Sequence, residues 1–371
     1  MDLSIVIPTF NRPHLLRETL DSVLAQSCPA REIIVVDNGT GDETQQLLDE
    51  YGPLILPVRI EPSGVQRARN VGTITATSTW IAFLDDDDLY RPTFVEAVSE
   101  PMTDSRVNMI VTDHRKFDHP PARRRRDPRT QFELAPDGYW DGVARPEPGR
   151  EWSFVGSFPP ARLLRYNAFY PSTMVVRKAL VEEIGGFDPA VRGIKSEDMD
   201  FTCRAIPVAR VAVVWKDLVD YRVHESNTSG DWLSKRFGRW RIFERVHETN
   251  AHGSAELHSA LEEDLPGRRR SNFDLAFLLG QFDVVIEAAP RLRPQDWTPM
   301  RRAMLSVARR VEMLPPRVLA LQRRVHRTCG TGVLRVQHAM QRAASAPSAV
   351  ELRGGQDGLV ARLICNNPVD V

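Results

Sequence analysis

Trp80-Ile81-Ala82-Phe83-Leu84-Asp85-Asp86-Asp87-Asp88 is a short apolar run that ends directly in four carboxylates. Such a run predicts a buried strand. Side chains alternate along a strand, so Asp85 and Asp87 point the same way and repel each other. Mg²⁺ and Mn²⁺ prefer oxygen ligands and often share them with substrate phosphates. The stretch therefore predicts a metal–diphosphate site at a strand's carboxyl end; the alternative is an acidic, solvated turn.

Strands and helices alternate around this stretch through residues 1–115. Strands are predicted at 3–7, 32–36, 58–60, 80–84 and 107–112, and helices after Pro13 and over 43–51 and 66–77. This alternation predicts an α/β fold with a mainly parallel sheet and helices on both faces. Ligands of such sheets bind beyond the carboxyl ends of the strands. Polar groups follow three strands, at 9–11, 37–38 and 85–88, and we expect them to meet at one rim.

The chain length of 371 residues fits two domains. We predict a catalytic domain over 1–230, interrupted by an irregular, Pro- and Arg-rich insertion at 117–165 that contains the run Arg123-Arg124-Arg125-Arg126. A mainly helical domain over 231–371 follows. Its helical patterns lie at 274–279, 284–288, 300–311, 317–325 and 333–343.

Charge and composition limit the function classes. The helical part carries 22 basic and 15 acidic residues, a net charge of +7, so it can seek phosphate, an anionic membrane or an acidic partner, or dock on the acidic N-terminal part. No aromatic pattern accompanies the arginine run, so nucleic acid is not an expected partner. The four scattered cysteines, the absence of a membrane-spanning run and the lack of a signal peptide predict a cytoplasmic protein. Peripheral contact with the inner membrane face and a homo-oligomer remain open through the C-terminal helices.

Two acidic residues are candidates for catalysis. Asp198 begins a predicted helix, and a helix N-terminus favours negative charge, which suits a general base. Glu197 could orient it or bind substrate. Placement for the helix dipole alone is the alternative. Arg67 or Arg69 could reach a phosphate from a helix near the rim, and His224 by itself is more often structural than a ligand.

Seven short motifs occur in an order that resembles a known family. They are 5–12 (Ile-Val-Ile-Pro-Thr-Phe-Asn-Arg), 33–44, Arg69-Asn70-Val71-Gly72, 83–88, Gly185-Gly186-Phe187-Asp188, Glu197-Asp198-Met199-Asp200 and Arg222-Val223-His224. Over about residues 1–230 the chain is similar to the family-two inverting glycosyltransferases of the GT-A fold. The resemblance implies a Rossmann-like mixed, mainly parallel sheet flanked by helices.

The resemblance also implies site residues. Pro8, Thr9, Asn11, Asp37, Arg69, Asp85 and Asp86 match positions that hold the nucleotide sugar, with Asp37 on the uracil edge. Asp87, Asp85 and His224 match the metal site for Mn²⁺ or Mg²⁺. Asp198, with Glu197, matches the catalytic base. Asp88 is a substitute or a sugar contact.

The expected function is metal-dependent, inverting transfer of a hexosyl or N-acetylhexosaminyl group from a UDP-sugar to an acceptor hydroxyl. The acceptor, a glycan, natural product, lipid-linked molecule or protein, does not follow from the resemblance. One rival is a nucleotide-sugar-binding module without turnover, and another is a scaffold whose helices at 317–343 bind a membrane or partner. A Rossmann dehydrogenase is disfavoured because no Gly-X-Gly-X-X-Gly follows the first strand.

Overall fold

A computed structural model describes residues 1–118, 129–143, 149–223 and 232–313 of the chain. The strands are β1 Leu3–Thr9, β2 Glu32–Asp37, β3 Leu56–Arg59, β4 Trp80–Phe83, β5 Leu89–Tyr90, β6 Met109–Asp118, β7 Trp152–Gly156, β8 Met174–Arg177 and β9 Val211–Val223. The helices are α1 Pro13–Leu24, α2 Glu43–Tyr51, α3 Val65–Thr75, α4 Phe94–Thr103, α5 Lys178–Glu183, α6 Asp198–Ala205, α7 Trp232–Thr249, α8 Ala255–Leu278, α9 Phe282–Ala288 and α10 Pro299–Glu312.

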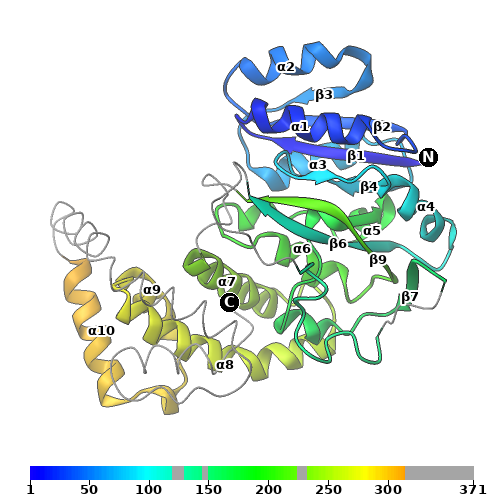
Figure 1. Cartoon of the computed structure of the whole chain (residues 1–371). Coiled ribbons are helices and arrows are strands. Elements are labelled where there is room, and N and C mark those ends of the chain that lie inside the picture. The colour runs from blue at the N-terminus through cyan, green and yellow to red at the C-terminus, as the bar shows by residue number, and fades with distance from the viewer. Residues whose placement is uncertain (119–128, 144–148, 224–231, 314–371) are drawn as a thin grey trace. The chain divides into compact units, whose positions relative to one another are not determined.

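All described strands belong to one sheet in the order β3-β2-β1-β4-β8-β6-β9-β5, with β7 paired to β9 (Figure 1). The half from β3 to β4 is parallel, as the strand–helix alternation predicts. In the other half only β6 and β9 run parallel, while β8 is antiparallel to both β4 and β6. The sheet is therefore mixed and flanked by helices, as the resemblance implies, and its fully parallel part is the half from β3 to β4. A strand that follows a helical crossover runs parallel to its neighbour. β8 follows the insertion instead, so it can pair antiparallel.

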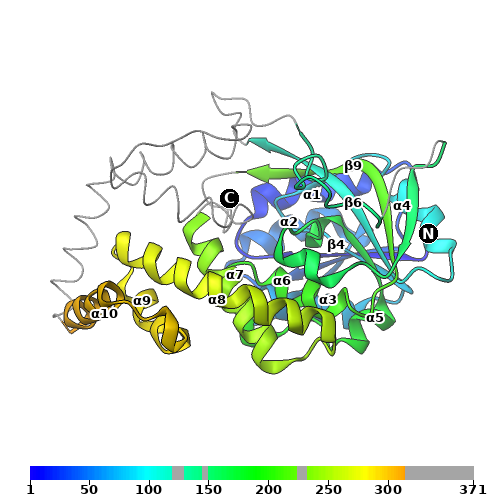
Figure 2. The same cartoon turned by 90° about the horizontal axis from the view of Figure 1, so that it is seen from below.

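The two faces of the sheet are covered by different helices, as Figures 1 and 2 show. Alternate residues of β1, Leu3, Ile5 and Ile7, belong to one buried cluster with apolar side chains of α1, α2 and α4. Val6 points to the opposite face, where it meets Gly72 of α3. Because side chains alternate along β1, α3 packs on the face of the sheet opposite to α1, α2 and α4.

Gly72 allows α3 to approach β1 closely. A Cβ atom at this position would lie 2.2 Å from Cγ1 of Val6, far inside van der Waals contact. We expect Gly72→Ala to lower the free energy of unfolding by roughly 1–3 kcal/mol, because overpacking outweighs the gain in helix propensity. Urea denaturation measures this. Ile74→Ala is the matched control on the same helix, since Ile74 is 76% exposed, and an equal loss in both variants would contradict the packing explanation.

The insertion at 117–165 contains more regular structure than the sequence predicts. β7 lies inside it and pairs with β9, and Phe132, Tyr139 and Trp140 pack against one another and against neighbouring rings. The expectation of an irregular segment is therefore wrong for residues 152–156. Contacts between aromatic rings stabilise the described part of the insertion. The Pro- and Arg-rich composition did not indicate them. The arginine run at 123–126 lies outside the described residues.

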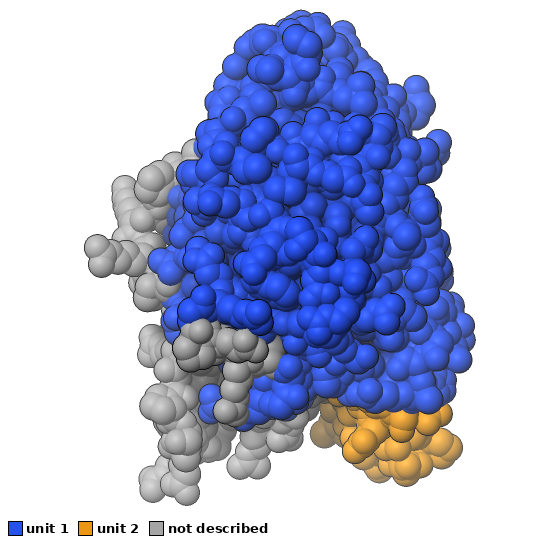
Figure 3. Space-filling model, turned by 90° about the vertical axis from the view of Figure 1, so that its right-hand side faces the viewer, with its two compact units in different colours: residues 1–231, 245–258 blue, residues 232–244, 259–371 orange. Residues whose placement is uncertain are grey.

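The chain divides into two compact units, coloured in Figure 3. Unit 1 comprises residues 1–231 and 245–258, and unit 2 comprises residues 232–244 and 259–371. Within unit 2, Glu244 accepts hydrogen bonds from Trp240 at 2.7 Å and from Arg269 at 2.6 and 2.7 Å. The helical patterns predicted at 274–279, 284–288 and 300–311 fall in α8, α9 and α10. Those at 317–325 and 333–343 lie outside the described residues. None of the helices that the structure describes has the length and apolarity needed to span a bilayer.

Candidate active site

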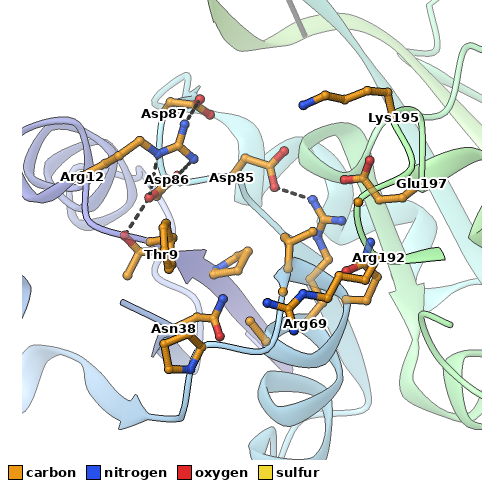
Figure 4. A pocket seen from close by; sticks show the side chains of 18 of the residues that line it. Thr9, Arg12, Asn38, Arg69, Asp85, Asp86, Asp87, Arg192, Lys195 and Glu197 are labelled. Carbon is orange, nitrogen blue, oxygen red and sulfur yellow. Dashed lines mark hydrogen bonds and ion pairs between the residues drawn. The ribbon is translucent and has the colours of Figure 1, made fainter. Parts of the chain in front are cut away.

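A pocket of about 490 Å³ opens beyond the carboxyl ends of β1, β2 and β4 (Figure 4). The three polar strand ends meet there, as the sequence predicts. The hydroxyl of Thr9 donates to Asp86 at 2.6 Å, and the backbone N–H of Asn38 donates to the carbonyl of Thr9 at 2.9 Å. The pocket is lined by Pro8, Thr9, Phe10, Arg12, Asn38, Pro62, Gly64, Val65, Gln66, Ala68, Arg69, Asp85, Asp86, Asp87, Arg192, Gly193, Ile194, Lys195, Glu197 and Tyr221.

The acidic quartet divides into different environments. The side chains of Asp85 and Asp87 line the pocket and are 30% and 14% exposed. Asp88 is buried and does not line it: its carboxylate accepts hydrogen bonds from the hydroxyl of Ser172 at 2.6 Å and from the backbone N–H of Arg222 at 3.0 Å. The pKa of Asp88 is raised by burial and by the neighbouring carboxylates. Its predicted role as a substitute or sugar contact is therefore wrong.

Asp86 touches the pocket but is fully buried. Burial raises the pKa of Asp86 to about 6, an effect that Arg12 opposes and Asp87 reinforces. The guanidinium of Arg12 contacts Asp86 through Nη2 and, at 3.3 Å, through Nε. Its Nη1 donates to Asp87 at 2.7 Å. Arg12 is not among the predicted site residues, although it stands beside Asn11 in the first of the seven motifs.

Arg69 reaches the pocket from α3 and donates to Asp85 at 2.6 Å. It is buried, whereas Arg67 on the same helix is exposed, so the geometry separates the two arginines that the sequence left open. The Nε and Nη1 atoms of Arg69 have no hydrogen-bond partner in the described residues. Its guanidinium lies 5.1 Å from the ring centroid of Phe187, which belongs to the Gly-Gly-Phe-Asp motif. Buried donors without partners suit an anionic ligand.

Glu197 lines the same pocket, and Asp198 follows it as the first residue of α6. The pKa of Glu197 is raised by burial and by Asp198, while Arg69 opposes the shift. Burial lowers the pKa of Arg69, but Asp85, Glu197 and Asp198 outweigh it and raise that pKa. The charge of Arg69 is therefore stabilised by Asp85 and by the Glu197–Asp198 pair. Asp198 is not itself a lining residue.

The loop before α6 adds two cations that the sequence analysis missed, Arg192 and Lys195 (Figure 4). The aliphatic part of Arg192 packs on Gly64, at the beginning of α3. Positive φ angles at Gly193 and Ser196 turn the backbone of this loop sharply. Neither cation stands in a motif, so the nearby Glu197-Asp198 pair was the one signal that could have drawn attention to them.

Asp37 lies at the end of β2 and is fully buried. Its Oδ1 accepts the backbone N–H of Gly39 at 2.9 Å, and its Oδ2 has no hydrogen-bond partner in the described residues. Asn38, not Asp37, lines the pocket. Asn11 does not line it either: its side chain links the ends of β1 and β2 by two hydrogen bonds to Thr40, at 2.9 and 3.1 Å. His224 lies outside the described residues.

A mixed sheet flanked by helices, with aspartates and arginines at its carboxyl rim, matches the GT-A fold. Residues 4–183 match the model of glycosyl transferase family 2. This N-terminal part of the chain is therefore similar to that family.

Solved structures resemble the chain in fold, and curated glycosyltransferases resemble it in sequence. TarS of Staphylococcus aureus, solved as residues 1–349, superposes with a TM-score of 0.55 at 18% identity, over 84% of this chain and 90% of that one. Against the longer TarS chain the match covers 53% of its length. An uncharacterized glycosyltransferase of Rickettsia typhi is 25% identical over 63% of this chain and 67% of its own. A PGL/p-HBAD biosynthesis glycosyltransferase of Mycobacterium tuberculosis is 29% identical over 55% and 70%.

Proposed function

We propose that residues 1–230 form the catalytic domain of an inverting glycosyltransferase that uses a UDP-sugar and Mg²⁺ or Mn²⁺. The observation that carries this proposal is the arrangement around Arg69. Asp85 and Asp87 at the end of β4, and Glu197 before α6, line one pocket, and Arg69 lies among them. Asp85 and Asp87 lie more than 100 residues before the Glu197–Asp198 pair in the chain, as expected when the first two bind a donor and Asp198 activates an acceptor.

The charges of the pocket support a metal–diphosphate ligand. Four cationic side chains, Arg12, Arg69, Arg192 and Lys195, face four carboxylates, Asp85, Asp86, Asp87 and Glu197. A nucleoside diphosphate alone would leave this balanced pocket with excess negative charge, which a divalent cation offsets. Asp85 and Asp87 fit such an ion because they offer partly exposed carboxylate oxygens, the ligands that Mg²⁺ and Mn²⁺ prefer. The bound ion would stabilise the negative charge of the departing diphosphate.

The side chains then have separate tasks. Arg69 helps to neutralise the charge that develops on the leaving UDP. Asp198 accepts the proton of the acceptor hydroxyl as that oxygen attacks the anomeric carbon from the face opposite the diphosphate. The bond from the anomeric carbon to the diphosphate oxygen breaks in the same step, so the configuration inverts and no covalent enzyme intermediate forms. A hexosyl or N-acetylhexosaminyl group is the expected cargo; one TarS structure contains UDP-GlcNAc.

A panel of nucleotide sugars with Mn²⁺ tests the proposal. A bound donor raises the melting temperature of the native protein, so we expect the largest rise with a UDP-sugar. The selected donor is then incubated with candidate hydroxyl acceptors, and NMR of the product reports the anomeric configuration. Retention of configuration would contradict the mechanism. Binding without any transfer across acceptors would favour a nucleotide-sugar-binding module.

Asp37 provides a prediction about the base. Its Oδ2 accepts no hydrogen bond from the described residues and has Nε of Arg59 at 3.9 Å as an ion-pair partner. We expect this oxygen to accept the N3–H of uracil, so Asp37→Ala should weaken UDP binding about tenfold, the loss typical of a hydrogen bond to a charged group. Isothermal titration calorimetry measures the affinity. Asp49→Ala is the control, because Asp49 is exposed and its side chain contacts Gln45 on the same helix. Equal UDP affinity in both variants would remove Asp37 from the uracil edge.

A further inference from the structure

Arg12 occupies the part of the acidic quartet where a metal ion is proposed to bind. It directly precedes α1, three residues after the end of β1, and its guanidinium lies between Asp86 and Asp87 (Figure 4). Nε and Nη2 face Asp86, and Nη1 donates to Asp87. The two aspartates therefore have a cation beside them before any ligand arrives.

The contacts of Arg12 with Asp86 and with Asp87 differ in whether a ligand could replace them. Asp86 is fully buried and is held by Arg12 and by the Thr9 hydroxyl at 2.6 Å. An ionised buried carboxylate that lost its cation would be strongly destabilised, so this contact is a permanent anchor. Asp87 is partly exposed at the pocket and receives one N–H from Arg12. This single hydrogen bond can be exchanged for a ligand without breaking the Asp86 contact.

We propose that Arg12 competes with the divalent ion for Asp87, so that metal binds weakly until the nucleoside diphosphate arrives. This inference rests on the proposed function, because it assumes a metal ligand at Asp87. A guanidinium that donates to a carboxylate oxygen both occupies that oxygen and repels a second cation. The negative charge of the diphosphate offsets the repulsion and gives Nη1 a new acceptor. Arg12 thereby makes metal binding depend on the donor.

The competition predicts opposite effects of one substitution on two affinities. In Arg12→Gln, Mn²⁺ alone should bind about tenfold more tightly, the order expected when one competing charge-assisted hydrogen bond is removed. UDP in the presence of saturating Mn²⁺ should bind several-fold more weakly, because the diphosphate loses a cation. A residue with a purely structural role would weaken both affinities. The EPR signal of free Mn²⁺ measures the first affinity, and calorimetry measures the second.

Two further variants make the test specific. Arg12→Lys keeps the positive charge near Asp86 but lacks the fork that reaches Asp87, so it should also bind Mn²⁺ more tightly even if Arg12→Gln folds poorly. Arg192→Gln removes a different cation from the same pocket and should change Mn²⁺ affinity less than twofold, which controls for general charge. Tighter Mn²⁺ binding in both Arg12 variants, but not in Arg192→Gln, supports the competition.

Failure of this inference can be distinguished from failure of the proposed function. If the unaltered protein binds Mn²⁺ with UDP, but the Arg12 variants bind Mn²⁺ alone no more tightly than it does, the competition is wrong and the metal site stands. An equal gain in Arg192→Gln would also overturn the competition. If the unaltered protein binds no Mn²⁺ even with saturating UDP, the metal role of Asp87 is wrong and the inference falls with it.

Discussion

Asp198→Asn should lower the rate of sugar transfer by about 10²–10⁴-fold, the contribution of a positioned general base, while UDP affinity stays within about twofold. The amide cannot accept the proton of the acceptor hydroxyl, but it has nearly the same size at the beginning of α6. Release of UDP in the presence of acceptor measures the rate, and calorimetry measures donor binding. The variant thus separates an enzyme from a module that binds nucleotide sugars without turnover.

Glu197→Gln is the matched comparison for this result. Glu197 lines the pocket and has a raised pKa. Asp198 is the next residue, and its charge helps to raise the pKa of Arg69. We expect a loss of about tenfold from Glu197→Gln, because it removes a charge beside Arg69 but not the base. If Asp198→Asn transfers sugar at the normal rate and Glu197→Gln does not, the base is Glu197. If neither change matters, the acidic pair has no catalytic role.

Asp87→Ala should lower turnover by about 10²–10³-fold and should abolish its dependence on Mn²⁺. Asp87 is one of the two carboxylates of the quartet with exposed oxygen at the pocket, so the remaining Asp85 would have to hold the ion alone. Rates measured across a Mn²⁺ titration, with chelator as the starting point, give both quantities.

The control for Asp87→Ala is Asp104→Ala, which removes an aspartate whose hydrogen bonds go to Arg106 outside the pocket. This control should retain the normal rate and metal dependence. Two results would contradict the metal role: full activity of the unaltered protein in excess chelator, or a normal Mn²⁺ response in Asp87→Ala. The melting temperature of each variant shows whether a loss of rate reflects unfolding.

Local sequence patterns predicted the elements around the site well. The helix predicted over 43–51 has the same bounds in α2, and the strand at 80–84 differs from β4 by one residue. The mixed half of the sheet was not predictable in this way. β6 and β9 begin with the short apolar stretches 109–111 and 211–214, and they continue as polar, partly buried strands that the pairing with each other stabilises. The residues of one strand do not show which strand it pairs with, so the local sequence does not predict these polar extensions.

The sequence by itself determined the α/β order and the polar strand ends. Both depend on covalent neighbours and on backbone periodicity. Strand alternation did not place Asp85 and Asp87, because β4 ends at Phe83 and the two residues lie in the turn that follows. The tertiary structure alone decided that Asp88 is a buried support, that Arg12 holds Asp86 and Asp87, and that Arg192 and Lys195 face the same pocket. These contacts join residues 74 or more positions apart. Burial and the path of the chain create them, and no local pattern contains that information.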